Sequence, residues 1–247
     1  MAIQTSESQV DVSDIKCAAR FEGQFRFMDS AGEFITRVGE QRPEWEPVRS
    51  VPGQAFFKHH KDPIVAEVGN LSLAVSYRGT LKLVDAASVI EKFSLAAEYF
   101  YEAVASVIRS KRTERLGVVF VFDFPAGSVE EADRFVVKGT ECPFSALVAA
   151  ESNARFVDVG ANFFFASEGS SVRRSFTFNS TARNRKPGSP PLEGFPVTEG
   201  DGAVQVTVDN FTRLDTGHQG KLRMFTQDRY AESKSIAVKI MQTRVRS

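Results

Sequence analysis

The fold is decided by two neighbouring stretches, Asp85–Arg109 (DAASVIEKFSLAAEYFYEAVASVIR) and Leu116–Phe122 (LGVVFVF). In the first stretch apolar residues recur every three or four positions, which predicts an amphipathic helix of about six turns. Asp85 suits the N-cap position, and the basic residues that begin at Arg109 favour a helix end there. The second stretch is apolar without interruption, which predicts a strand buried on both faces and therefore central in a sheet. We expect the helix to pack over this strand.

Upstream of the helix, the sequence predicts short antiparallel strands. Phenylalanines between Phe21 and Phe27, followed by the turn-forming stretch at residues 29–32, predict a hairpin that continues to Val38. Residues 42–53 contain three prolines, each of which lacks a backbone donor, so this segment is expected to be a surface loop. Strand-like runs then follow at residues 54–57, 64–68, 71–77 and 81–84.

Downstream of the central strand, the pattern is again rich in strands. Residues 155–166 and 172–179 flank the turn-like sequence at residues 168–171, which predicts a second hairpin. Strict alternation at residues 204–208 and again at residues 236–241 predicts two more strands, the latter at the C-terminus. Residues 221–230 fit either a strand or a short helix.

These elements predict an α+β chain built on a predominantly antiparallel β-sheet of about ten strands, with one long amphipathic helix packed on a central buried strand. Residues 1–14 are expected to be a flexible N-terminus, and residues 15–247 a single domain. Residues 183–202 hold four prolines and four glycines and are expected to form a long mobile loop within it. The residues after this loop are too few for an independent core. No repeat of roughly 20–50 residues is visible.

Composition narrows the class of protein. The 247 residues are 42% hydrophobic and 25% charged, which excludes wholesale disorder, collagen-like repetition and a membrane-embedded chain. Lys and Arg (31) balance Asp and Glu (31), so net charge indicates no particular partner. The 22 phenylalanines, against four tyrosines and one tryptophan, are expected to build the core. Without a visible secretory signal, Cys17 and Cys142 fit free thiols in a reducing compartment, so we expect a cytoplasmic protein with no membrane partner.

Catalytic and metal-binding patterns are weak. The only candidate metal site consists of His59, His60 and His218 with the carboxylates Asp62 and Asp215, because imidazoles and carboxylates suit first-row metals. Adjacent residues on a strand point to opposite faces, so His59 and His60 are ill placed to share one ion, and a polar turn before Pro63 is the alternative. No catalytic residue and no cofactor are predicted.

Charge is unevenly distributed in the second half. Residues 173–186 and 221–247 are both basic, and the acidic stretch at residues 187–220 separates them. If the two basic segments adjoin in space, they would form a surface for nucleic acid or another anionic partner. The candidate residues are Arg173, Arg174, Arg183, Arg185, Lys186, Lys221 and Arg223.

Three functions remain open. The first is a non-catalytic binding or assembly subunit of a multi-protein complex (viral, phage or bacterial), working through a protein partner or self-association as an oligomer; exposed sheet edges favour it. The second is RNA or DNA binding through the basic segments. The third is an enzyme or a small-molecule carrier with an apolar, phenylalanine-lined pocket.

Overall fold

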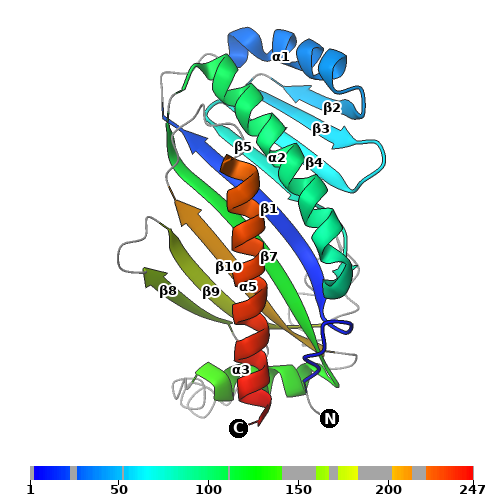
Figure 1. Cartoon of the computed structure of the whole chain (residues 1–247), viewed down its shortest axis with the longest axis vertical. Coiled ribbons are helices and arrows are strands. Elements are labelled where there is room, and N and C mark those ends of the chain that lie inside the picture. Colours follow the sequence, from blue (N-terminus) through cyan, green and yellow to red (C-terminus); the bar gives the residue numbers. More distant parts are fainter. Residues whose placement is uncertain are drawn as a thin grey trace, which may run out of the picture.

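The computed structural model describes residues 3–22, 27–51, 53–110, 112–140, 160–166, 172–182, 202–212 and 221–246. Ten strands form one antiparallel sheet in the order β2-β3-β4-β5-β1-β7-β10-β9-β8, and β6 pairs with β1 beside this path (Figure 1). In chain order the elements are β1 (Asp11–Phe21), α1 (Phe27–Gln41), β2 (Trp45–Val51), β3 (Gln54–His59), β4 (Ile64–Val68), β5 (Ser72–Tyr77), β6 (Leu81–Lys82), a 3₁₀ turn (Leu83–Asp85), α2 (Ala86–Ile108), β7 (Thr113–Ala126), α3 (Val129–Thr140), β8 (Gly160–Ala166), β9 (Arg173–Ala182), β10 (Gly202–Thr212) and α5 (Lys221–Arg246). The predicted α+β class and the ten-stranded antiparallel sheet are confirmed.

The described elements repeat one order twice. The first half runs from the long strand β1 through α1 and the antiparallel strands β2–β5 to the long helix α2. The second runs from the long strand β7 through α3 and the strands β8–β10 to the long helix α5. The two halves join where β1 and β7 pair antiparallel at the centre of the sheet. The repetition lies in the order of the elements, and its unit is far longer than a repeat of roughly 20–50 residues.

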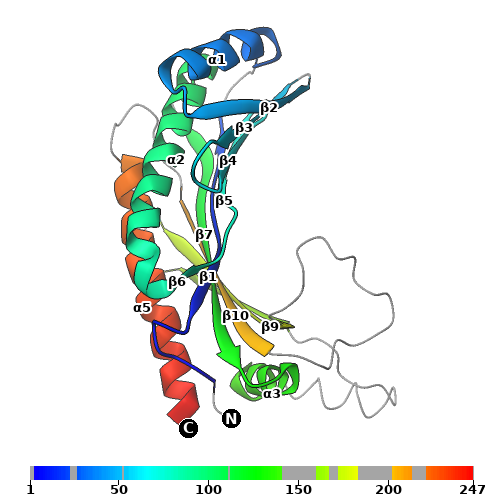
Figure 2. The ribbon, with the colours of Figure 1, turned by 90° about the vertical axis from the view of Figure 1, so that its right-hand side faces the viewer.

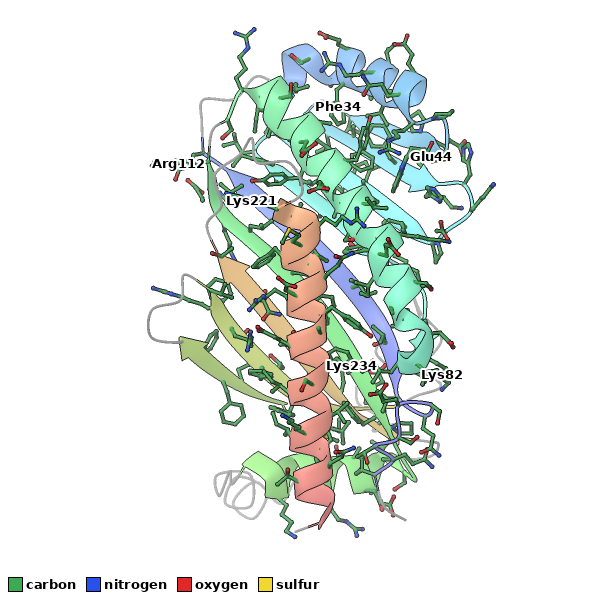
Figure 3. The ribbon with its side chains drawn as sticks, in the orientation of Figure 1. Phe34, Glu44, Lys82, Arg112, Lys221 and Lys234 are labelled. Atoms are coloured by element: carbon green, nitrogen blue, oxygen red, sulfur yellow. The ribbon has the colours of Figure 1, made fainter. Side chains whose placement is uncertain are left out.

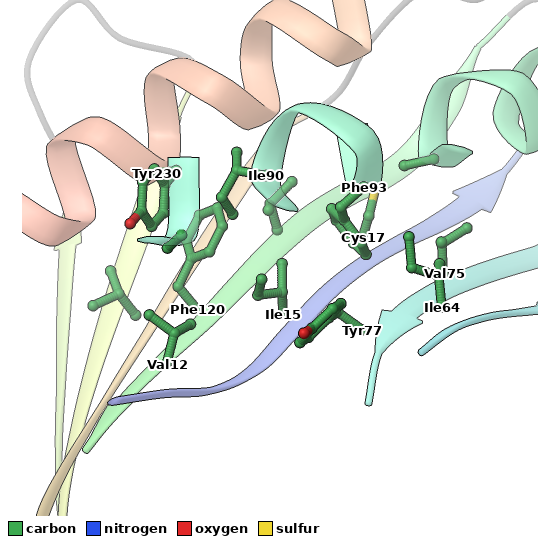
Figure 4. Packing of buried hydrophobic residues seen from close by; sticks show 14 of the residues in the cluster. Val12, Ile15, Cys17, Ile64, Val75, Tyr77, Ile90, Phe93, Phe120 and Tyr230 are labelled. Carbon is green, nitrogen blue, oxygen red and sulfur yellow. The ribbon is translucent and has the colours of Figure 1, made fainter. Parts of the chain in front are cut away.

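Helices α1, α2 and α5 lie on one face of the curved sheet, and the middle of the concave face carries no described helix (Figure 2). The core therefore lies between these three helices and the sheet. Side chains from α2, β1, β7 and α5 meet there, including Phe93, Ile15, Cys17, Phe120 and Tyr230 (Figure 4). The phenylalanines build this core as expected: Phe34, Phe57, Phe93, Phe100, Phe120, Phe122 and Phe124 are all fully buried.

The strongest local patterns are confirmed, but the long helix does not pack over the central strand as expected: α2 packs on β5, β1 and β4, and α5 packs on β7. The predicted helix is α2, with Asp85 at its N-cap and Arg109 at its C-cap in the left-handed conformation (φ 51°). The hairpin predicted around residues 168–171 is the β8–β9 pair. The central apolar strand is β7, but it is asymmetric. Its even-numbered side chains from Leu116 to Phe124 enter the core. Its odd-numbered residues lie on the concave face, where Gly117 and Val121 are buried and Val119 is half-buried.

The predicted hairpin from Phe21 to Val38 is wrong. Phe21 ends β1, and residues 27–41 form the helix α1 instead. Phe34 and Val38 are buried four positions apart, so they share one helical face, and Phe34 meets Phe57 of β3 with ring centroids 5.8 Å apart. Figure 3 shows Phe34 between α1 and the neighbouring strands. Turn-forming residues at positions 29–32 obscured this spacing because they lie inside the helix.

The predicted C-terminal strand is also wrong, because residues 221–246 form one helix, α5. Its buried positions recur every three or four residues, which is a helical spacing. Two of them, Thr226 and Ser233, are polar, so the apolar signal in the sequence was diluted. The buried positions are Leu222, Thr226, Tyr230, Ser233, Ala237 and Met241.

Two segments expected to be irregular contain regular structure. β2 occupies residues 45–51, within the segment expected to be a proline-rich surface loop, and Pro47 is tolerated because β2 is an edge strand. β1 starts at Asp11, inside the 1–14 segment expected to be flexible, and Val10 and Val12 are fully buried. The expected mobile loop lies almost entirely outside the described residues, since only Gly202 is described.

Local chemistry fixes the start of α3. The Ser128 hydroxyl accepts the Glu131 backbone N–H at 3.2 Å, and the Glu131 carboxylate accepts the Gly127 N–H at 2.9 Å, which closely resembles a capping box. β10 starts directly against this turn. A Cβ at Gly202 would lie 2.2 Å from the Ser128 carbonyl oxygen, so only glycine fits there.

Candidate functional site

The concave face of the sheet is the first candidate site, and the strand register shows which side chains it presents. Ala18 of β1 lies opposite Ala74 of β5 on one side and Gly117 of β7 on the other. These three small residues form a low floor across the central strands. Glu67 of β4 continues the same row beyond Ala74.

A hollow of about 450 Å³ lies over this floor, within the usual size range of small-molecule sites. Charged side chains surround it. Three are cationic and two are acidic: Lys16, Arg20 and Arg115, against Glu67 and Asp209. The chemistry of the hollow is therefore ionic.

Two arginines stand directly opposite one another at one end of the hollow. Arg20 of β1 pairs in register with Arg115 of β7. Each has a carboxylate partner: Arg20 lies 2.8 Å from Glu114, and Arg115 lies 3.0 Å from Asp209. Like charges directly opposite one another weaken an antiparallel pair, so the sheet gains no stability from this arrangement.

Arg115 is held in place from two directions. Its guanidinium lies over the ring of Phe211 with Cζ 4.7 Å from the centroid, and it donates to the Asp209 carboxylate. Burial raises the pKa of Asp209, and Arg115 opposes that rise. The other carboxylate oxygen of Asp209, Oδ1, is buried without a hydrogen-bond partner among the described residues. Gly117 leaves room for it, since a Cβ there would lie 3.4 Å from that oxygen.

The predicted basic residues divide between the two faces of the sheet. Arg173 is exposed, and its strand neighbour Arg174 projects to the helix-covered face. There Arg174 is paired with Glu232 of α5 and donates to Asn210 at 2.6 Å.

The basic residues of α5 lie near its start. Lys221 is exposed there, as Figure 3 shows, and Arg223 lies 3.2 Å from Glu91 of α2. Arg183, Arg185 and Lys186 lie outside the described residues. The four described cations therefore do not share one face, and nucleic-acid binding through these segments stays a prediction.

The predicted histidines are placed as parts of a turn and an edge. His59 Nδ1 accepts the backbone N–H of Asp62 at 2.9 Å, and its ring packs edge-on against Trp45 at 5.2 Å between centroids. His60 is exposed with Nε2 4.0 Å from Glu46. Within the described residues no group of three or more potential metal ligands occurs. His218 lies outside them, and a metal site stays a prediction.

A second hollow of about 280 Å³ lies on the helix-covered side beside α2. Tyr99, Trp45 and Leu95 supply its aromatic and apolar lining, and Asp62 lies 3.3 Å from Lys92 at its margin. His59 also lines it, but its Nδ1 is already used by the turn. Arg42 and Glu44, which also line it, pair with each other at 3.4 Å, so the charged groups of this hollow are largely paired among themselves.

Among the described strands, β2 and β8 are the edges of the sheet, and they differ in how well they are protected. Edge strand β2 carries Glu46 and Pro47, and a bulge interrupts its register directly after Pro47. Charges, proline and bulges are devices that prevent edge-to-edge pairing. Edge strand β8, with the sequence GANFFFA, contains no charge and no proline. Phe164 is 78% exposed on one face of this strand, and Phe163 is 38% exposed on the other face.

Sequence reasoning missed the concave face and its arginines. Arg20 immediately precedes the segment predicted to form a hairpin, and Arg115 immediately precedes the apolar run that predicts β7. Only the β1–β7 pairing brings them together. For β8, the uncharged phenylalanine-rich sequence was the available signal, although nothing in it identifies an edge.

No protein-family model matches the chain, and the search of curated proteins found no related sequence. In the described part of the chain, no helix is both long and apolar enough to span a bilayer.

Proposed function

We propose that this chain is a non-catalytic assembly subunit that joins a second copy of itself by pairing the β8 edges of the two sheets. The observation that carries the proposal is the contrast between the two edges. β2 has a proline, a charge and a bulge, whereas β8 has none of these and exposes two phenylalanines. An unprotected apolar edge strand is a template for pairing with another strand.

The β8 sequence suits pairing with itself. In an antiparallel pair centred on Phe164, the two copies of Phe164 lie opposite one another on the same face. Phe163 lies on the other face and already packs against Phe178 with ring centroids 6.0 Å apart. Cross-strand aromatic pairs favour such an arrangement by roughly 0.2–1 kcal/mol each. No like charges meet across this edge, because β8 contains none.

The expected interface is small. A phenylalanine buries roughly 150–250 Å², so the exposed parts of Phe163 and Phe164 together supply about one such ring per copy. A stable specific interface buries about 1,200–2,000 Å² in total, so one edge pairing alone gives a reversible, concentration-dependent dimer.

Sedimentation velocity over about 1–200 µM tests this proposal, because a small interface gives an affinity in that range. We expect wild-type protein to shift from monomer towards dimer as concentration rises. Phe164→Lys, which adds a charge to the edge, should weaken association by about tenfold or more. The matched control is Val48→Lys on β2, where Val48 is 62% exposed, and it should leave association unchanged.

Hydrogen exchange of the β8 amides supplies a local readout, since strand pairing protects backbone N–H groups. Protection of β8 should rise with protein concentration, and protection of β2 should not. A wild-type chain that stays monomeric at the highest concentration would overturn the proposal. Equal loss of association in Phe164→Lys and Val48→Lys would also overturn it, because the interface would then not be β8.

A further inference from the structure

We infer that the hollow on the concave face binds a small molecule through an oxyanion group, held by Arg20, Arg115 and Lys16. This inference is independent of the β8 pairing. It rests on the hollow of about 450 Å³, on the opposed arginines at its end and on the low floor beside them. None of these features contributes to assembly at the sheet edge.

The arginines match an oxyanion in both charge and geometry. A guanidinium presents a planar fork of N–H donors that pairs with two oxygens of a carboxylate or phosphate. Arg115 is already fixed by Phe211 and Asp209, so little of its side-chain freedom is lost on binding. An anion between Arg20 and Arg115 would relieve the repulsion across the β1–β7 pair. Lys16 adds a third cation, which interacts electrostatically with Asp14 two residues earlier on the same strand.

The floor and the far side restrict the rest of the ligand. Ala18, Ala74 and Gly117 leave space for a flat group to lie against the strands. Glu67 lies at the other side of the hollow, and its carboxylate is a hydrogen-bond acceptor by chemistry. The ligand class is therefore an anionic small molecule that carries an N–H or O–H donor away from its oxyanion.

The oxyanion could come from a phosphate ester or from a carboxylate, and two probes separate these sources. Pyrophosphate and citrate are titrated separately into ¹⁵N-labelled protein at low salt, and amide shifts are followed at Ala18 and Gly117. We expect saturable shifts at these floor positions with a Kd of about 10 mM or tighter for one probe. Saturation by pyrophosphate alone identifies a phosphate ligand, and saturation by citrate alone identifies a carboxylate ligand. Saturation by both leaves the oxyanion site supported for either source.

Matched variants locate the binding. Arg20→Gln removes one cation of the opposed pair and should weaken binding by about tenfold, the loss expected for a charge-assisted contact. Ala18→Met fills the floor without changing charge and should weaken binding by a similar factor. Arg37→Gln makes the same charge change on α1, where Arg37 pairs with Glu33 at 2.8 Å, and should leave the affinity within about twofold.

The donor at the far side of the ligand has its own test. Phosphoethanolamine carries an ammonium group that inorganic phosphate lacks, so only its binding should weaken in Glu67→Gln. Equal effects on both probes would remove Glu67 from the site. The inference as a whole is overturned if neither pyrophosphate nor citrate reaches half-saturation by about 20 mM, or if Arg37→Gln weakens binding as much as Arg20→Gln. Hydrogen-exchange protection of the core strands in each variant verifies that it is folded.

Discussion

Truncation of Phe100 to alanine should lower the free energy of unfolding by about 4–5 kcal/mol, near the top of the range for buried phenylalanines. Phe100 lies on α2 and is 0% exposed. Its ring centroid is 4.7 Å from that of Trp45 and 5.3 Å from that of Phe57. Each aromatic pair adds roughly 0.5–1.5 kcal/mol beyond the area it buries, so losing these two pairs and a third with Tyr99 at 5.4 Å places Phe100→Ala above the average.

Urea unfolding followed by far-UV circular dichroism measures this change, because Trp45 fluorescence would itself respond to loss of its neighbour. Domains are typically stable by about 5–15 kcal/mol, so we expect the variant to fold with a lower urea midpoint and an unchanged m-value. Leu95→Ala on the same helix is the control. Leu95 is 43% exposed, and its truncation should cost less than about 1 kcal/mol. A loss below about 1 kcal/mol for Phe100→Ala, or equal losses in both variants, would refute the packing of α2 on the sheet.

Two further predictions concern buried polar groups. Ser233→Ala removes the acceptor 3.0 Å from the buried Asn210 amide and should lower the free energy of unfolding by about 1–3 kcal/mol. Ser235→Ala on the exposed side of α5 should change it by less than about 0.5 kcal/mol. Equal urea midpoints for the two variants would contradict this polar contact. Burial raises the pKa of Cys17 from 9.0 to about 12, so between these pH values the thiol ionises in the unfolded chain but not in the folded one, and the free energy of unfolding falls as pH rises. Cys17→Ala should reduce the slope of this fall by up to about 1.4 kcal/mol per pH unit. An unchanged slope in urea unfolding at alkaline pH would refute the burial of the thiol.

Prediction from sequence succeeded where one element carries a complete signal. Nearly all buried residues of α2 are apolar, so the helical period is visible in its sequence without knowledge of the elements packed against it. β10 alternates between buried valines and half-exposed polar residues because only one of its faces enters the core. The β8–β9 hairpin is similarly local, since a short connection joins two strands that pair directly.

Prediction failed where neighbouring elements accommodate polar or turn-forming residues inside regular structure. α5 buries Ser233 because Asn210 of β10 donates to it, and that partner is visible only after folding. Thr226 is buried because its hydroxyl bonds to the Leu222 carbonyl one turn earlier, at 2.9 Å. In both cases a hydrogen bond within the fold satisfies a group that the sequence pattern assigns to the surface.

The sequence by itself determined the class of the fold, the long helix, the central strand and the phenylalanine core, because these depend on the local spacing of apolar residues. Only the tertiary structure decided that β1 pairs with β7 and that β8 is an edge. Strand register depends on packing between elements far apart in the chain, so Arg20 and Arg115 became neighbours only once both halves had been joined. The hollow on the concave face arises from that pairing, and the exposed β8 edge arises from the order of the strands in the sheet. Neither the pairing nor the strand order is encoded within a single segment.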